Sequence, residues 1–575
     1  MDMLSSSTLA AFAGAGALAI LLPKAASRLK LSRAKHPSLT GHVRMAKRLA
    51  GLMPAYSLDD AVFFGADDVG PEVQARRREG FHDLARTFRE RFARSRRLTE
   101  EAKQGLSDLQ FTSRYRVPFP FQKRVGAELG AGTFLRETEG GYVTDLDGNR
   151  FFDLTGAYGV NVLGWQFYKD CLREAEEAAR ALGPVLGSYH PVVADNVARL
   201  RAVSGQDEVS FHMSGTEAVM QAVRLARYHT GRRRLVRFSG AYHGWWGGVQ
   251  PGIGNPVAED DTLTLAEMSE KTLDCLRDRR DIACVLVNPL QALHPNGGAP
   301  SDSALVDSSR GAGYDRAAYT DWLRRLREVC TERGIVLILD EVFMGFRLAP
   351  GGAQDYFGVK ADLVTYGKTL GGGLPVGVLC GRAGLMRRFD EDNPGDICFA
   401  RGTFNSHPYV MCAMNGFLRA LERPEVRALY DDLDARWNAR AAHLNGLLSG
   451  AGLPVRVANL QTVWTVLYDR PSRYNWMFQF YLRAEGLALS WVGTGRLIFS
   501  LDCGEADFAV VCERFVRAAR AMDRDGWWEC GLASNKEIRR RVLREAARAG
   551  WARLKRRFGG AGREEGREIS PQPSL

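Results

Sequence analysis

Two short runs of apolar residues, 335–339 and 361–366, stand out along the chain because each ends abruptly in polar residues. The first run is followed by Asp340, and the second by a glycine and Lys368. Continuous apolar runs of this length, with polar residues only at the carboxyl end, are typical of buried parallel strands. Because ligands of open α/β sheets bind outside those carboxyl ends, we expect Asp340 and Lys368 to face one pocket.

Neither residue is diagnostic by itself, because an Asp at a strand end is more often a helix cap and a lone Lys is usually a solvated surface charge. The pair is more informative. A pyridinium cofactor needs a carboxylate that keeps its ring nitrogen protonated and an amine that holds its aldehyde as a Schiff base. One strand end offers each group, and the glycines at 371–373 would let the backbone pass close to a bulky ligand.

A third segment, residues 207–218, has the pattern of a strand that runs into a helix, with Ser214, Gly215 and Thr216 at the turn. The first turn of a helix offers free N–H groups, a favourable dipole and small hydroxyl donors, so it can bind a phosphate group. An ordinary serine N-cap explains the same spacing equally well.

Together these segments resemble the signature of class III aminotransferases, which are pyridoxal phosphate (PLP) enzymes of fold type I. In that signature an Asp at a strand end is followed, 28 residues later in this chain, by a Lys, a glycine-rich turn and a Pro. Within the family, the wording is most similar to glutamate-1-semialdehyde aminomutase and its aminotransferase relatives. The resemblance covers roughly residues 125–525. It implies an α/β fold with a large domain, built on a mainly parallel seven-stranded sheet flanked by helices, and a smaller α/β C-terminal domain.

The resemblance also implies which residues bind PLP. Lys368 would form the Schiff base and later move a proton, and Asp340 would pair with the pyridinium nitrogen. Tyr242, in the segment AYHG, would stack on one face of the ring, and Val342 would pack on the other. A lone His is more often structural, so we do not place the neighbouring His243 in the catalytic set. The cofactor phosphate would be held by Ser214, Gly215, Thr216 and Thr403.

Two further roles come from the same resemblance. Thr403, in the segment RGTFNSHP, would reach across a dimer interface to the phosphate of the partner subunit. The active site would then be shared, and the protein would be a homodimer. Arg124 is placed by counting back from the hairpin that residues 141–154 predict, and it would bind a substrate carboxylate. A surface Arg beside Lys123 is an equally good interpretation of Arg124.

The chain departs from the family pattern at three positions. Met213 stands where the family often has Asn, and Asn288 stands where a Glu usually precedes the Pro. Gly495 falls at the position of the gating Glu of the aminomutases, which argues against an aminomutase. The adjacent Arg496 is a further candidate for contact with the substrate.

Three functions remain compatible with these residues. The first is a PLP-dependent aminotransferase that moves an amino group from a small-molecule donor to an aldehyde or keto acceptor in two half-reactions. The second is glutamate-1-semialdehyde 2,1-aminomutase, which would move the amine within one molecule. The third is a non-catalytic, membrane-associated scaffold on a PLP fold. The scaffold hypothesis predicts a broken Asp–Lys pair, which this chain does not show.

The amino-acid composition limits the possible binding partners of the protein, but it says little about the reaction. The chain has 575 residues, of which 45% are hydrophobic and 25% are charged, as in globular proteins. Ten cysteines include no CxxC pair and no His at ligand spacing, which argues against a metal site and a disulfide scaffold. Residues 24–48 and 535–558 each carry a net charge of +8, which leaves −5 for the rest of the total of +11. This distribution favours contact with an anionic surface over nucleic-acid binding.

The two ends of the chain indicate how such contact would arise. Residues 9–23 carry no charge, and counted from Leu4 the stretch has about twenty residues, near the minimum for a membrane span. Since basic residues follow it, we expect a signal-anchor that leaves the bulk of the chain in the cytoplasm, or else a packed or disordered N-terminal segment. Residues 535–558 predict a basic amphipathic helix suited to the inner face of a membrane, or docked on the protein. Residues 559–575 are expected to be disordered.

The predicted units follow from these features. Within the extension before the catalytic fold, residues 76–97 predict one long amphipathic helix, a structural clamp, with Phe81, Leu84, Phe88 and Phe92 on its apolar face. The order is a candidate membrane anchor (1–23), a mostly helical extension (24–110), the N-terminal segment of the catalytic fold (111–165), the large PLP-binding domain (166–400), the small C-terminal domain (401–530), and the basic helix with its tail (531–575).

Overall fold

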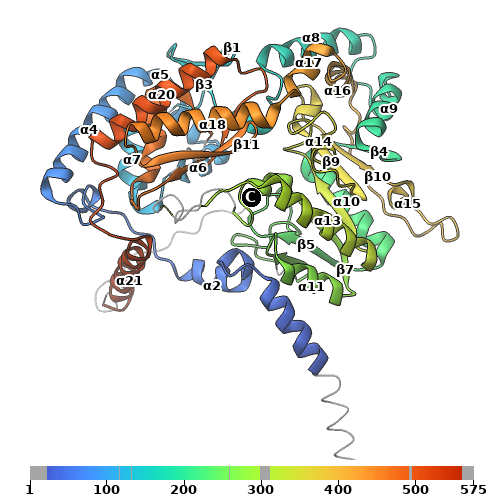
Figure 1. The fold of residues 1–575 in the computed structure, drawn as a ribbon, viewed down its shortest axis with the longest axis horizontal. Coiled ribbons are helices and arrows are strands. Elements are labelled where there is room, and N and C mark those ends of the chain that lie inside the picture. Colours follow the sequence, from blue (N-terminus) through green and yellow to red (C-terminus); the bar gives the residue numbers. More distant parts are fainter. Residues whose placement is uncertain are drawn as a thin grey trace, which may run out of the picture.

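A seven-stranded sheet forms the centre of the larger part of the molecule (Figure 1). The computed structural model describes residues 22–115, 117–130, 132–257, 260–297, 308, 311–490 and 495–559. Strand β10 is antiparallel to both of its neighbours, and the other pairs are parallel, which confirms the predicted sheet. The strand order is β4 (Glu208–His212), β10 (Gly377–Gly381), β9 (Leu363–Gly367), β8 (Val336–Asp340), β7 (Ile282–Val287), β5 (Arg234–Phe238) and β6 (Thr262–Leu265).

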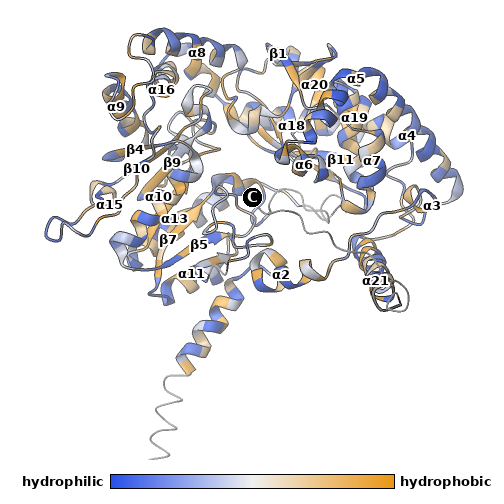
Figure 2. Ribbon diagram, turned by 180° about the vertical axis from the view of Figure 1, so that it is seen from behind, coloured by the Kyte–Doolittle hydropathy of each residue, from blue (hydrophilic) through white to orange (hydrophobic). Residues whose placement is uncertain are grey.

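Both faces of this sheet are covered by helices, which explains why its central strands are apolar throughout. In β8, Val336 and Ile338 join the apolar cluster around α10 (Gly215–Thr230). The alternate residues Leu337 and Leu339 join the core that contains α13 (Arg316–Arg333). Because successive side chains of a strand point to opposite faces, a strand buried on both sides reads as a continuous apolar run. Figure 2 shows the same uniform hydrophobicity along β7.

A smaller part of the molecule packs beside the main sheet and contains two further sheets. One has the order β1 (Leu135–Glu139), β2 (Tyr142–Asp145), β3 (Arg150–Asp153) and β13 (Leu487–Ala488). The hairpin predicted over 141–154 is confirmed, because β2 and β3 pair antiparallel around the turn. The other sheet has the order β11 (Val455–Leu460), β12 (Val463–Tyr468) and β14 (Leu497–Ile498), and it packs with α18 (Leu433–Gly450) and α20 (Glu505–Arg524).

Helix α16 (Pro408–Ala420) lies after the expected domain boundary at 401. It packs on α8 (Trp165–Ala179) and α9 (Val192–Ser204). Other α-helices of the described chain include α3 (Asp60–Phe63), α7 (Gln122–Glu128), α11 (Glu270–Asp278), α14 (Gly352–Phe357), α15 (Ala383–Met386), α17 (Pro424–Arg427) and α19 (Phe478–Ala484).

The extension contains two consecutive helices where one was predicted. Helix α4 (Pro71–Arg91) buries the predicted Phe81, Leu84 and Phe88, but the backbone leaves the helical region at Phe92. Helix α5 (Ala93–Lys103) begins directly after it. The carboxylate of Asp147, in the β2–β3 turn, accepts hydrogen bonds from the first amides of α5 at 2.7 and 2.8 Å. This long-range cap satisfies the free donors of a new helix start, and it is the reason that a single helix was the wrong prediction.

Arg77 on α4 fixes the extension to the body. Its guanidinium is fully buried, pairs with both oxygens of Asp67 at 2.8 and 3.0 Å, and donates to the carbonyl oxygen of Gly526. Leaving either charge alone in this dry site would cost about 3–5 kcal/mol. The extension is therefore part of the folded body, and its role as a structural clamp stays a prediction.

The two basic flanks lie on one side of the molecule in both views (Figures 1 and 2). They comprise a helix at 22–34, helix α2 (Val43–Leu52) and helix α21 (Asn535–Gly559), of which the last confirms the predicted C-terminal helix. Among the described residues, no helix is long and apolar enough to cross a membrane. Residues 1–21 of the expected anchor and 560–575 of the expected tail lie outside the described part of the chain.

Candidate active site

A cavity of about 1010 Å³ lies at the carboxyl ends of the parallel strands, against the smaller part of the molecule. Its walls include residues that follow β4, β5, β8 and β9. From the small domain, the described lining residues are Ser490, Gly495, Arg496 and Ile498. This is the place where open α/β sheets bind ligands. Both Asp340 and Lys368 line the cavity, so the expectation that they share one pocket is confirmed.

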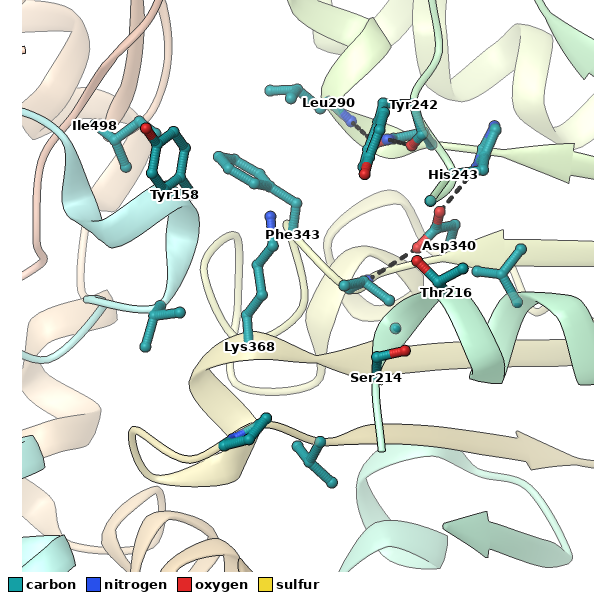
Figure 3. Close-up of a pocket in the computed structure, with 18 of the residues that line it drawn as sticks. Tyr158, Ser214, Thr216, Tyr242, His243, Leu290, Asp340, Phe343, Lys368 and Ile498 are labelled. Atoms are coloured by element: carbon teal, nitrogen blue, oxygen red, sulfur yellow. Dashed lines mark hydrogen bonds and ion pairs between the residues drawn. The ribbon is translucent and has the colours of Figure 1, made fainter. Parts of the chain in front are cut away.

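Strand pairing brings the two residues to the same edge. Asp340, the last residue of β8, lies opposite Thr365 of β9. Strand β9 ends at Gly367, and Lys368 is the next residue. The Lys368 backbone has φ of +50°, an uncommon left-handed conformation for a residue with a side chain. Its Nζ atom lies 4.4 Å from the centre of the Phe343 ring (Figure 3). The amine is therefore held over an apolar surface inside the cavity.

The environment of Lys368 favours its neutral form. Burial lowers the pKa of the Lys368 amine to about 7, since a charged ammonium is costly away from water. Asp340 opposes this by raising the pKa, whereas Arg496 and Arg347 lower it further. A neutral amine near pH 7 is able to act as a nucleophile and as a proton acceptor.

Asp340 is held by a network that sequence reasoning did not identify. Its Oδ2 accepts a hydrogen bond of 2.8 Å from Nδ1 of His243, and its Oδ1 accepts bonds from the Val342 amide and the Thr365 hydroxyl at 3.2 and 3.3 Å. Burial lowers the pKa of the His243 imidazole, against the opposing effect of Asp340, so the ring donates as a neutral group. His243 therefore orients the carboxylate. In the sequence, the only indication of this role is that His243 directly follows Tyr242. The contact with Asp340 depends on the order of the strands, which the sequence does not show.

The start of α10 forms the wall next to Asp340. The Ser214 hydroxyl accepts from the Glu217 amide at 3.3 Å, and the Glu217 carboxylate accepts from the Met213 amide at 2.9 Å. This arrangement resembles a capping box in which the Glu bonds the amide just before the N-cap. Ser214 is the N-cap, and the next amides have no partner within the helix. A Cβ atom at Gly215 would lie 2.6 Å from Val342, so only glycine fits there. Ser214, Gly215, Thr216 and Val342 all line the cavity.

Tyr242 lines the cavity on the side of Asp340 and is half-exposed (Figure 3). The side-chain amide of Asn288 donates to the Tyr242 carbonyl oxygen at 2.8 Å, while its oxygen accepts from the Leu290 amide at 3.1 Å. Asn288 thus replaces the usual acidic residue with a neutral group that fixes the loop carrying Tyr242.

Arg496 enters the cavity from the small domain. Burial lowers the pKa of its guanidinium to about 10, and its Nε atom is buried without a hydrogen-bond partner among the described residues. The adjacent Gly495 lines the same wall and carries no side chain. Asp340 is the sole acidic residue among the described residues of the cavity wall. The arrangement can therefore accept an anionic group beside Lys368.

Two of the predicted site residues lie outside the described cavity wall. Arg124 pairs with Asp60, and its guanidinium lies 4.9 Å from the centre of the Phe64 ring in the extension. The geometry therefore does not support its predicted contact with substrate, because counting back from the hairpin ignores the extension that engages it. Thr403 is exposed on the surface. Its contact with a partner's phosphate stays a prediction.

Comparison with known proteins agrees with this geometry. The model of the family "Aminotransferase class-III" matches residues 127–498. The chain belongs to the class-III aminotransferase family. As a member, it is a PLP-dependent enzyme, which confirms the family, fold, enzyme class and cofactor predicted from the signature.

The relatives of this aminotransferase include both reaction types. Glutamate-1-semialdehyde 2,1-aminomutase of Desulfotalea psychrophila is 34% identical over 375 residues, which cover 61% of this chain and 80% of the relative. The β-phenylalanine aminotransferase of Variovorax paradoxus is 25% identical with a TM-score of 0.61, covering 78% of this chain and 98% of that structure. A transaminase solved with PLP bound is 27% identical with a TM-score of 0.57, covering 69% and 92%.

The residues of the cavity fit PLP. The buried amine of Lys368 suits its aldehyde, the oriented carboxylate of Asp340 suits a protonated ring nitrogen, and the free amides at the start of α10 suit its phosphate. Because Val342 lies so close to Gly215 that a Cβ atom would clash, residue 215 offers only its backbone amide to the phosphate.

We expect the reaction of the PLP-free protein with added PLP to depend on pH with a midpoint near 7, because the neutral Lys368 amine is the reactive form. Arg496→Met removes a charge that lowers the pKa of Lys368, so the midpoint should rise. Asp340→Asn removes the carboxylate that raises this pKa, so the midpoint should fall. Stopped-flow absorbance measures the rates, with Nα-acetyl-lysine as the control for ionisation of PLP itself. A midpoint near 10.5, the value of an ordinary lysine, would contradict the account.

Proposed function

We propose that this class-III aminotransferase moves an amino group between two separate small molecules, an amino donor and an aldehyde or keto acceptor, through Lys368. The observation that carries the choice over an aminomutase is the small-domain wall of the cavity, which offers Gly495 and Arg496 and no carboxylate among the described residues. An intramolecular transfer remains the alternative, because the curated relatives include aminomutases.

Each site residue has a distinct task in this proposal. Bound PLP supplies an electron sink that stabilises negative charge on the substrate carbon. The amine of Lys368 would hold the cofactor aldehyde. Once a substrate amine takes its place, its neutral Nζ would accept the proton from the substrate carbon and pass it to the cofactor carbon that receives the amino group. Asp340, oriented by His243, would pair with the ring nitrogen. Tyr242 and Val342 would pack on the ring, while Ser214, Gly215 and Thr216 would bind the phosphate.

We assign the anionic group of the substrate to Arg496 in place of Arg124. A buried guanidinium without a carboxylate partner among the described residues is costly, and a substrate carboxylate would compensate its charge. Arg496 also lowers the pKa of Lys368, so it lies close enough to orient a substrate at the reacting amine.

An isotope experiment separates the two reactions. With a ¹⁵N-labelled amino acid as donor and an unlabelled oxo acid as acceptor, we expect the label in the new amino acid, at a rate that depends on both substrates. Arg496→Met should raise KM for carboxylated donors roughly tenfold or more, since a charge-assisted hydrogen bond is lost. Formation of 5-aminolevulinate from glutamate-1-semialdehyde as the sole product, with no transfer between molecules, would overturn the proposal in favour of the aminomutase.

We also propose that the functional unit is a homodimer with a shared site. Thr403 is exposed, as a residue that reaches another subunit must be in a single chain. Three large apolar side chains are exposed as well. Phe399 and Phe404 are close to Thr403 in the sequence, and Trp245 is close to Tyr242. Exposed aromatic residues of this kind are enriched at protein interfaces.

Subunit mixing tests the dimer. Lys368→Ala and Thr403→Arg should each abolish or strongly reduce activity. When equal amounts of the two variants exchange subunits at random, half of the dimers contain one chain of each variant. Each of these mixed dimers would hold one intact site. We therefore expect activity to return to about one quarter of the wild-type value by this counting. No recovery, with exchange shown by tagged subunits, would contradict a shared site.

A third proposal concerns location: the basic flanks hold the enzyme against the inner, anionic face of a membrane, with the body in the cytoplasm. Helix α21 is fixed to the body by buried Ile538 and by an ion pair of 2.7 Å between Glu545 and Arg473. Its other side exposes Leu543, Trp551 and Leu554 among arginines. Apolar residues flanked by basic ones suit a lipid interface.

Helix α2 extends this surface. It carries basic residues and no acid, and it exposes Met45, Leu49 and Leu52. The chain just after α2 touches α21, since a Cβ atom at Gly550 would lie 3.7 Å from Pro54. The C-terminal end of α2 therefore lies near α21, and both helices are on the same side of the molecule (Figure 1). A docked helix that serves only the fold is the alternative.

Vesicle sedimentation of the full chain tests this location. We expect binding to vesicles that contain phosphatidylserine, weakening as salt rises, and little binding to phosphatidylcholine vesicles. Trp551→Ser together with Leu554→Ser should weaken binding roughly tenfold or more, because both side chains lose burial in lipid. Leu447→Ser, at an exposed leucine of α18, is the matched control. Equal binding of both vesicle types, or no effect of the α21 substitutions, would contradict the proposal.

A further inference from the structure

We propose that the substrate carries a bulky apolar group, an aromatic ring or a long alkyl chain, and that Phe111 of the N-terminal extension forms part of the wall that binds it. This inference rests on the proposed aminotransferase function and adds to it the class of substrate and a residue that selects it.

The cavity has two chemically different halves. Asp340, His243 and the start of α10 form the polar half that suits the cofactor. Beyond the Lys368 amine, on the side away from Asp340, Figure 3 shows Tyr158, Phe343 and Ile498. Val160, Leu290 and Leu374 are further apolar residues of the cavity wall. Because the Lys368 Nζ lies only 4.4 Å from the Phe343 ring centre, the apolar surface begins at the reacting atom.

Phe111 reaches this cavity from outside the region that the family model matches. It lies on α6 (Ser107–Arg114), whereas the match begins at residue 127. Helix α6 packs against α5 and α7, and the residue before α7, Phe121, packs on Trp476 of the small domain with ring centres 5.1 Å apart. Phe111 therefore approaches from the small-domain side, the same side as Arg496 and Ile498.

The Phe111 side chain lines the cavity and is only partly buried. It is about half-exposed, at 55%, and its ring lies 4.6 Å from the ring of Tyr115 on the next turn. A large apolar side chain that is solvent-exposed inside a cavity gains free energy when a ligand covers it, by about 25 cal/mol per Å² of apolar surface removed from water. Aromatic side chains also offer a rigid face to stacked or alkyl groups.

The size and polarity of the cavity suit a large apolar substrate better than a small substrate with two carboxylates. Its volume of about 1010 Å³ is at the upper end of the roughly 300–1,000 Å³ of typical ligand sites, which leaves room for a large group beside the cofactor. Among the other polar residues of the wall, Asn288 and Gln250 already donate to the carbonyl oxygens of Tyr242 and Gly244. Arg496 can neutralise one carboxylate. A second would be desolvated against apolar side chains, which is costly.

A donor series tests the substrate class. With the PLP-loaded enzyme, we compare L-alanine, L-norleucine, L-2-aminooctanoate, L-phenylalanine and L-glutamate, each with one fixed oxo-acid acceptor. Glutamate and norleucine have side chains of equal length and differ in charge. We expect kcat/KM to rise about tenfold or more from alanine to norleucine or phenylalanine, and glutamate to fall well below norleucine. Equal or better transfer from glutamate, or no dependence on apolar size, would overturn the inference.

Phe111→Ala tests the selecting residue, with Leu106→Ala at an exposed leucine just before α6 as the matched control. Phe111→Ala should raise KM for norleucine and 2-aminooctanoate about tenfold and lower kcat/KM for alanine by far less, and Leu106→Ala should change neither. Equal losses for alanine and norleucine would show a structural role and overturn the assignment. Absence of transfer from every donor, with PLP still bound, would overturn the proposed function itself, whereas transfer independent of chain length overturns this inference alone.

Discussion

The register between β8 and β9 is the constraint on which the rest of the site depends. Because Asp340 lies opposite Thr365, a carboxylate and an amine emerge at the same edge of the sheet. A slip by one residue would turn Asp340 to the opposite face and remove it from the cavity. The register is strongly specified because both faces of these strands are buried against helices. The large core therefore fixes the geometry of two side chains.

Burial decides the electrostatics of the site as well. The carboxylate of Asp340 favours a charged Lys368, but burial and the nearby Arg496 and Arg347 outweigh it, and the pKa falls to about 7. Arg347 itself bonds to Thr462 and to the carbonyl oxygen of Phe499 in the small domain. The position of the small domain thus influences the charge on the reactive amine, as well as the shape of the substrate half of the cavity.

The sequence predicted the features that depend on local pattern. The apolar runs, the hairpin and the strand–helix turn at Ser214 could all be read because burial on two faces and turn chemistry leave periodic signals. Contacts between distant segments were not accessible. The bond from His243 to Asp340 needs the strand order, the break at Phe92 needs the carboxylate of Asp147, and the engagement of Arg124 by the extension could not be counted from the hairpin. Arg496 was identified as a candidate for substrate contact, but the burial of its Nε atom without a hydrogen-bond partner among the described residues was visible only in the structure.

Identification of the lysine that binds the cofactor tests the central claim most directly. The PLP-loaded enzyme is reduced with borohydride, digested, and analysed by mass spectrometry for the peptide that carries the reduced cofactor. The account predicts the cofactor on Lys368, and no covalent label in Lys368→Ala even though the phosphate-binding residues are intact. A label on another lysine, or an unreduced and removable cofactor in the wild-type protein, would contradict the roles assigned to Lys368 and to its pairing with Asp340.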